Sequence, residues 1–237
     1  MGRAAEGVRG AWNLVSRAPP TTPIAPTLGE VTFDAMSFSP EDALSRLSTG
    51  AFLVARDVLR DPNFEGTVVL LCAHETDGDY GLVLNRASNM PLDEVFESLP
   101  PELRRPRTIH IGGPVEQDKI QILDWSGDGA PECQTIVPGI TMGGHWNFQW
   151  EDEPFLEEEG TGKRFHQADP TTYRIFLGYS GWSQGQLTSE IELGAWEVFH
   201  ADIVETICLG PDRIPKGEDE FAAWALEHPA ISRGGQE

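Results

Sequence analysis

The pattern of apolar and polar residues predicts a β-hairpin at the centre of the fold. Residues Thr67 to Ala73 form the longest near-continuous apolar run in the chain, and the run is rich in β-branched residues. A short run of this kind is typical of a strand that is buried on both faces. A polar turn with glycine follows at Glu75 to Asp79, and a second apolar run, Gly81 to Leu84, stops at Asn85-Arg86. Two apolar runs around such a turn indicate a hairpin.

Helical patterns occur at four other places. The stretch Ser39 to Asp42 is a helix start, because serine caps backbone amides, proline suits the first turn and acids favour the positive end of the helix dipole. Gly50 ends this helix. Three further stretches place apolar residues three or four positions apart, which predicts amphipathic helices; they are Leu92 to Leu99, Gln184 to Gly194 and Asp219 to His228.

Shorter apolar runs predict the remaining strands. They are Phe52 to Ala55, Thr108 to Ile111, Ile120 to Leu123, Tyr173 to Tyr179 and Trp196 to Phe199. Between them, the segment from Gly143 to Asp169 carries aromatic residues and an acidic run. We predict a surface loop or a short helix there, with the acids in solvent.

Length and composition predict one domain with an extension. A chain of 237 residues buries a sizeable core in one domain. Residues 1–37 are rich in alanine, proline and threonine, so we predict a disordered extension or a start codon placed too early, followed by a single domain over residues 38–237. A cleaved organelle-targeting segment is the alternative, because such segments are arginine-rich and Arg3, Arg9 and Arg17 lie here.

The net charge argues against nucleic acid and membranes as partners. The chain has 38 acidic and 17 basic residues, for a formal charge of −21. An acidic surface repels phosphate groups and anionic lipids, because binding either one requires clustered lysine and arginine. No apolar stretch approaches the ~20 residues of a membrane helix. We interpret the acidic surface as one that keeps the protein soluble. The alternative is that it docks a basic partner.

The cysteines indicate a reducing compartment, so we predict a cytoplasmic protein. Cys72, Cys133 and Cys208 are odd in number and far apart, and no CxxC pair occurs. Cys72 and His74 are expected on one face of the same strand, which is the sole metal-like pairing in the sequence. A metal site needs further ligands, so we predict no metal and no cofactor.

Two glycine-rich motifs fall short of known catalytic loops. Gly112-Gly113-Pro114 lacks the lysine and the spacing of a phosphate-binding loop, and a tight turn explains it. The sequence from Gly178 to Trp182 resembles a hydrolase nucleophile elbow, but tryptophan stands where that motif requires its last glycine. We interpret it as a strand end that packs closely against a neighbour.

Five motifs in a shared order give the chain a resemblance to the AlgH/YqgE family. They are GAFLVA (Gly50 to Ala55), LRDPNFEGTVVLLCAH (Leu59 to His74), DGDYGLVLNR (Asp77 to Arg86), GGPV (Gly112 to Val115) and FLGYSGWSQGQLTSEIELGAW (Phe176 to Trp196). The resemblance implies an α+β fold in which a strongly bent, bifurcated sheet forms a pseudo-barrel flanked by helices. It implies no established activity, although a regulatory role in alginate synthesis was attached to the first-named member. This chain departs from the common pattern at Ala73, Ala87 and Asp124, where relatives often have glutamate, proline and histidine.

The leading functional prediction is a binding or regulatory protein without catalytic residues. Polar residues at the end of an apolar strand often line a cleft, and Arg86 offers a fixed fork for a carboxylate or phosphate. The ligand is then a small anion or a partner protein, and glycine turns supply backbone N–H groups. The predicted binding residues are Asn63, His74, Asn85, Arg86, Gly112, Gly113, Pro114, Gly178, Tyr179, Gly181 and Trp182.

Two alternatives remain open from the sequence. The first is an enzyme of unrecognised type that uses His74 as acid or base beside Cys72, since histidine titrates near neutral pH, or that uses a cleft lined by Arg86. The second is that Arg86 is merely a solvated strand end or the partner of an acid.

Overall fold

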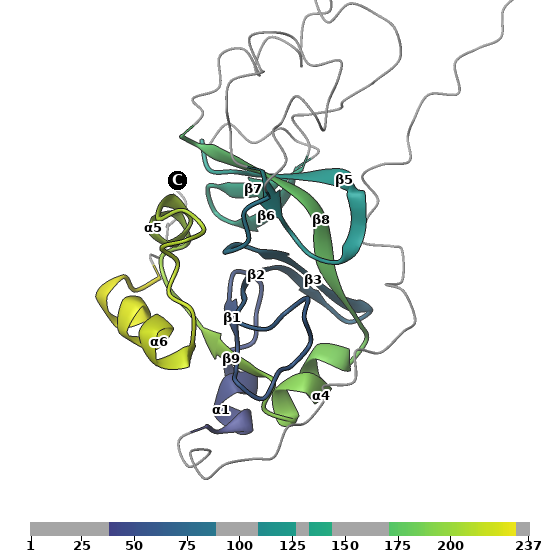
Figure 1. Ribbon diagram of the computed structural model, residues 1–237, viewed down its shortest axis with the longest axis vertical. Coiled ribbons are helices and arrows are strands. Elements are labelled where there is room, and N and C mark those ends of the chain that lie inside the picture. The colour runs from purple at the N-terminus through teal and green to yellow at the C-terminus, as the bar shows by residue number, and fades with distance from the viewer. Residues whose placement is uncertain (1–37, 89–108, 127–132, 144–170, 231–237) are drawn as a thin grey trace, which may run out of the picture.

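The computed structural model describes residues 38–88, 109–126, 133–143 and 171–230 (Figure 1). The extension at 1–37, the predicted helix at 92–99 and residues 144–169 of the predicted loop lie outside these ranges. None of the helices in the described ranges is long and apolar enough to cross a bilayer.

The described residues contain a nine-stranded sheet. Its order is β6-β7-β5-β8-β3-β2-β1-β9, and β4 pairs with β8 beside this path. All neighbours are antiparallel except β4 and β8, which are parallel. The strands are β1 (Phe52–Ala55), β2 (Val68–Glu75), β3 (Gly78–Val83), β4 (His110–Ile111), β5 (Val115–Asp124), β6 (Gln134–Val137), β7 (Ile140–Met142), β8 (Tyr173–Ser183) and β9 (Trp196–Phe199).

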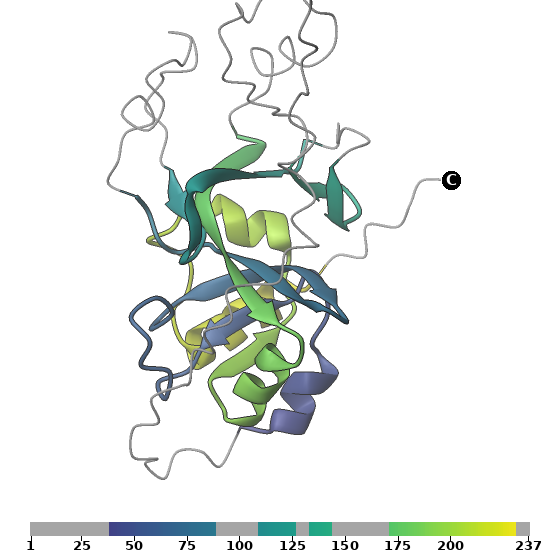
Figure 2. The same cartoon turned by 90° about the vertical axis from the view of Figure 1, so that its right-hand side faces the viewer.

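Strand β8 joins two half-sheets that lie at an angle to each other (Figures 1 and 2). Its first part pairs with β5 and β4, and its last residues pair with β3. Gly178 lies between these parts with a φ of +66°, and a Cβ there would lie 2.6 Å from the Val115 carbonyl oxygen. The predicted α+β class with a bent, bifurcated sheet is confirmed. The sheet is open, since no pairing joins β6 to β9 within the described part of the chain.

Two apolar cores fill the opposite faces of the central strands. Phe52, Leu70 and Leu82 belong to the first core, which α5 and α6 cover. Leu53 and Val69 belong to the second core, which α1 and α4 cover. Because alternate residues of β1 and β2 enter different cores, both faces of these strands are buried. This burial on both faces explains why the first strand of the hairpin is apolar at nearly every position.

The described helices are α1 (Pro40–Ser45), α4 (Gln186–Glu192), α5 (Ile203–Cys208) and α6 (Glu218–Glu227). The predicted start of α1 is confirmed, because the Ser39 side chain accepts a hydrogen bond from the Asp42 amide at 3.2 Å. The predictions did not include α5, although Asp202 caps it by accepting from the Glu205 amide at 2.8 Å.

The structure corrects one strand end and adds a hairpin. Strand β8 continues to Ser183, so Gly178 to Trp182 lie inside it and do not form a turn at its end. Strands β6 and β7 form a hairpin that the sequence analysis missed. Its turn is Pro138-Gly139, with apolar residues on both sides, which is a recognisable turn signal.

Candidate functional site

The Asn85-Arg86 pair binds the loop that connects β1 to β2. The Arg86 Nη2 atom donates to the Pro62 carbonyl at 2.8 Å and lies 3.4 Å from the Glu65 carbonyl oxygen. The Asn85 side chain accepts from the Val68 amide at 3.0 Å and donates to the Gly66 carbonyl at 2.9 Å. Burial lowers the pKa of the Arg86 guanidinium. The guanidinium therefore holds loop carbonyls in this structure, and the Asn85 side chain is hydrogen-bonded to the same loop through both its oxygen and its nitrogen.

Asn63, also predicted for the site, lies in the same loop. The backbone N–H group of Asn63 donates a hydrogen bond to the Asp61 carboxylate at 2.7 Å, and this contact forms a local turn. The structure thus places Asn63 in the loop that Asn85 and Arg86 bind, and the hydrogen bonds from these two side chains to other loop residues stabilise the loop.

Two of the predicted glycine segments do meet. The Gly112 amide donates to the Leu177 carbonyl at 2.8 Å, and the Gly112 carbonyl accepts from the Ser180 hydroxyl at 3.1 Å. A Cβ on Gly113 would lie 2.2 Å from the Tyr179 carbonyl carbon. Pro114, which follows, leads into β5. The glycines therefore permit close approach between two backbones, and the Gly112 amide is engaged within the sheet.

The remaining predicted residues of β8 point into the two cores. Tyr179 stacks on Tyr80 with ring centroids 4.5 Å apart, on the side of the first core. Trp182 is buried in the second core, and Gly181 pairs with Tyr80 in β3. Within the second core, the Trp182 ring stacks on Phe64 of the β1–β2 loop that Arg86 contacts, with ring centroids 5.9 Å apart. The Gly112 segment lies instead beside Leu82 and Phe176 of the first core.

A β-bulge separates Cys72 from His74. The register of β2 against β3 shifts between Leu71 and Ala73, which leaves Cys72 as the extra residue. Cys72 lies in the first core with no exposed surface, whereas His74 pairs with Asp79 on the other face. The prediction that both side chains share one face is wrong, because an inserted residue reverses the alternation of faces.

The chemistry of these two side chains follows from their surroundings. Burial raises the pKa of the Cys72 thiol far above its usual range, so the thiolate nucleophile does not form near neutral pH. The His74 Nδ1 atom contacts the Asp79 carboxylate at 2.5 Å. Burial raises the pKa of Asp79, and the contact with His74 partly offsets this rise. Within the described ranges, no three histidine, cysteine or acidic residues form a cluster suited to a metal.

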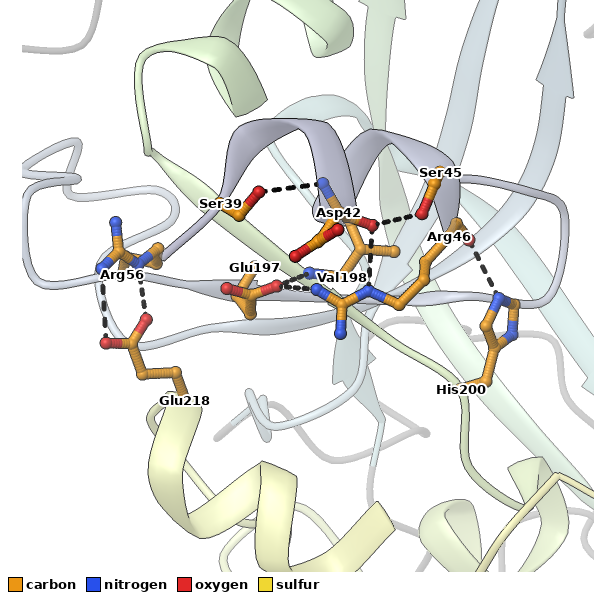
Figure 3. A network of polar contacts seen from close by, with 9 residues as sticks. All are labelled: Ser39, Asp42, Ser45, Arg46, Arg56, Glu197, Val198, His200 and Glu218. Atoms are coloured by element: carbon orange, nitrogen blue, oxygen red, sulfur yellow. Dashed lines mark hydrogen bonds and ion pairs between the residues drawn. The ribbon is translucent and has the colours of Figure 1, made fainter. Parts of the chain in front are cut away.

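A polar cleft of about 460 Å³ lies elsewhere, between α1, β9 and α6 (Figure 3). No residue of the predicted binding site lines this cleft. Its walls contain four carboxylates, one guanidinium and two phenyl rings. The lining residues are Phe38, Ser39, Asp42, Ser45, Arg46, Glu197, Phe199, Glu218, Asp219 and Ala222.

Two arginines contact residues of this cleft in the same way: Arg46 lines it, and Arg56 lies beside it against the lining residues Glu218 and Phe38. Arg46 contacts the Glu197 carboxylate at 2.5 Å, and its guanidinium carbon lies 5.8 Å from the centre of the Phe199 ring. Arg56 contacts the Glu218 carboxylate at 2.5 Å and lies 4.0 Å from the centre of the Phe38 ring. Each cation therefore combines a carboxylate with an aromatic face.

Glu197 connects the cleft to the edge of the sheet. Strand β9 is the last strand of the sheet path, and the Val198 amide donates to the Glu197 carboxylate at 3.2 Å. Burial raises the pKa of Glu197, while the Val198 amide and the two arginines partly offset the rise. The Glu197 carboxylate thus accepts a hydrogen bond from a backbone N–H group that would otherwise be unpaired at the sheet edge.

Sequence reasoning had little means of finding this cleft. Its lining comes from residues 38–46, 197–199 and 218–222, which are far apart in the chain. The local signals in these segments are helix caps and first-turn acids, and both are explained by helix formation alone.

Comparisons with known proteins support the resemblance seen in the sequence. The sequence profile of the AlgH-like family matches residues 52–213. A UPF0301 protein of Chlorobium phaeobacteroides is 33% identical over 194 residues, which cover 79% of this chain and 97% of that protein. A UPF0301 protein of Chlorobium chlorochromatii is 35% identical over 194 residues, which cover 79% of this chain and 96% of that protein.

A solved structure shows the same fold. The solution structure of the AlgH protein from Pseudomonas aeruginosa matches with a TM-score of 0.55 and 28% identity, over 80% of this chain and 95% of that one. The bent sheet and the extent of these matches agree with one another. The chain therefore belongs to the AlgH-like family, a UPF0301 family of uncharacterised function.

Proposed function

We propose that the protein is a non-catalytic binding protein whose cleft between α1, β9 and α6 accepts a basic side chain from an exposed segment of a partner protein. The observation that supports this most directly is the pair of internal arginines at the cleft. Arg46 and Arg56 each pair with a carboxylate and face a phenyl ring. These internal pairings support the proposal, because an incoming lysine or arginine would meet the same kinds of groups in the cleft.

Two carboxylates of the cleft remain for an incoming cation. Glu197 and Glu218 pair with the internal arginines, whereas Asp42 and Asp219 are exposed at the cleft and form no side-chain ion pair among the described residues. The formal charge of −21 also favours encounter with basic partners through long-range attraction.

The site predicted around Arg86 remains a prediction, and the cleft is the better candidate. The Arg86 guanidinium is bonded to loop carbonyls, and the neighbouring glycine backbones are in contact with each other. An enzymatic role for Cys72 with His74 lacks support, because the bulge places them on opposite faces. We also propose a cytoplasmic location, which the three free cysteines support.

The test uses a synthetic peptide of alternating lysine and glycine, with a glutamate–glycine peptide for comparison. Amide shifts in NMR spectra of the full chain locate the binding. We expect the lysine peptide to shift residues 38–46, 197–199 and 218–222, and the glutamate peptide to shift none of them. Each exposed ion pair contributes about 0.2–1 kcal/mol, so Asp42→Asn with Asp219→Asn should weaken binding roughly twofold to thirtyfold.

A matched double variant distinguishes the effect of the cleft carboxylates on binding from the effect of the net charge. Asp212 and Glu227 are exposed acids outside the cleft lining. Asp212→Asn with Glu227→Gln changes the net charge by the same amount, and we expect binding to remain close to that of the original chain. Equal weakening in both double variants, or shifts spread over the whole surface, would contradict the proposal.

A further inference from the structure

Three polar side chains share one buried face of the half-sheet that contains β4, β5 and β8. His110 in β4 and Gln121 in β5 both pair directly with Phe176 in β8, one from each side. Arg174 lies two residues before Phe176, so the two-residue period of a strand places it on the same face. Diagonal neighbours of this kind are within reach of long side chains.

Four buried nitrogen atoms of this group have no hydrogen-bond partner among the described residues. His110 is 3% exposed and Gln121 is 1% exposed. Both ring nitrogens of His110, the Nε2 atom of Gln121 and one terminal nitrogen of Arg174 are buried without a hydrogen-bond partner in the described chain. Buried polar atoms are nearly always satisfied in native proteins, so this concentration on one face points to a bound group.

The charge of the group is also uncompensated. No ion pair within the described ranges includes Arg174. Burial lowers its pKa, and only the thiol of Cys208 in α5 opposes this. Arg174 is half-buried, with one terminal nitrogen fully buried. Taking a cation out of water without a counter-ion is costly, and an anion on this face would reduce that cost.

The histidine supplies a neutral donor to the same place. Burial and then the charge of Arg174 lower the pKa of His110 to about 4. The Ile175 backbone beside the ring raises it in part, without meeting the geometry of a hydrogen bond. Near pH 7 the ring is therefore uncharged and carries one N–H group, and the amide of Gln121 adds another donor.

We propose that Arg174, His110 and Gln121 bind one small monovalent anion, of the size of chloride, on the face of the half-sheet that α5 covers. The single guanidinium supplies one positive charge, which matches a monovalent anion and leaves a phosphate dianion uncompensated. The neutral N–H groups complete the coordination. Helix α5 packs on this side of the half-sheet, because Phe176 of β8 and Ile207 of α5 belong to the same core. In Figure 2, α5 lies at a level between the two half-sheets.

Two measurements on the full chain test this proposal. In crystals grown with sodium bromide, we expect an anomalous bromide peak in contact with Arg174 and with at least one of the two other side chains. In solution, replacing chloride by gluconate at constant ionic strength should lower the melting temperature. The dependence on chloride gives an apparent affinity through mass action.

Variants separate a specific site from general salt effects. Arg174→Met should weaken the apparent chloride affinity at least tenfold. Gln121→Leu should weaken it severalfold, and it provides the test if Arg174→Met does not fold, because leucine is compatible with an apolar core. Arg60→Gln removes an exposed arginine that pairs with Glu65 and should leave the affinity unchanged. Water density without bromide, or a chloride effect of the same size in all variants, would overturn the proposal.

Discussion

Removing the carboxylate of Glu190 should strongly destabilise the second core. Glu190 is 6% exposed, and one of its oxygens accepts hydrogen bonds from the indoles of Trp182 at 3.0 Å and Trp196 at 2.8 Å. Its other oxygen accepts from the Gln186 amide at 2.9 Å. In Glu190→Ala, both buried indole N–H groups lose their acceptor. A buried donor without a partner costs about 1–3 kcal/mol, so we expect a loss of roughly 2–6 kcal/mol in the free energy of unfolding.

Glu190→Gln is the matched control, because it keeps an oxygen for the two indoles and removes only the charge. Its new amide group faces the amide of Gln186, so we expect the loss of a single hydrogen bond, about 1 kcal/mol. Urea unfolding followed by tryptophan fluorescence measures both variants. If Glu190→Ala unfolds within about 1 kcal/mol of the original chain, or if the two variants lose the same stability, the reasoning about the indoles is refuted.

The pH dependence supplies a second readout of the same carboxylate. Burial raises the pKa of Glu190, and the hydrogen bonds from Trp196, Gln186 and Trp182 partly offset the rise. A raised pKa means that the folded state binds the proton more tightly than the unfolded state. The associated stability is fully present below the unfolded pKa and is lost as pH rises through the folded pKa. Relative to Glu190→Gln, the original chain should therefore gain stability as pH falls towards the ordinary glutamate pKa.

Three further predictions concern other parts of the fold. Gly113→Ala should lower the free energy of unfolding in urea by about 3 kcal/mol or more, because its Cβ would lie 2.2 Å from backbone atoms. Gly66→Ala is the control: its φ is +65° but the space around the Cβ position is open, so the loss should be only about 1 kcal/mol. Arg86→Met should cost about 1.5–3 kcal/mol and speed amide hydrogen exchange in residues 62–67, and unchanged exchange would contradict its role in the loop. N-ethylmaleimide should modify the exposed Cys208 in the native protein and reach the buried Cys72 only after unfolding, as peptide mass spectrometry would show.

Much of the scaffold was accessible from the sequence, because local patterns carry it. The apolar runs of β1 and β2 and the capped start of α1 express strand and helix periods directly. The bend of the sheet came from the family resemblance, since no local pattern specifies an angle between half-sheets. The short helix α5 was missed, although Asp202 followed three residues later by Glu205 is a helix-start signal.

The candidate sites were harder to foresee, because tertiary contacts decide them. The bulge at Cys72 is a single-residue shift that no spacing in β2 reveals, and it reversed the expected relation to His74. The partners of Arg86 are backbone carbonyls, which every residue offers, so the sequence does not distinguish them from a ligand. The cleft combines Arg46 with Glu197, which lie 151 positions apart.

The unbroken course of β8 limits how the molecule can move. One strand of eleven residues supplies hydrogen-bonding partners to both half-sheets, and Gly178 redirects it without interrupting it. A hinge requires a few residues that can change their backbone angles freely, and the backbones of Gly113 and Val115 pack so closely against Gly178 that little space is left for such a change. We therefore expect the halves to melt together, and any response to a bound partner to be transmitted as a local adjustment of side chains, with no jaw-like opening of the sheet.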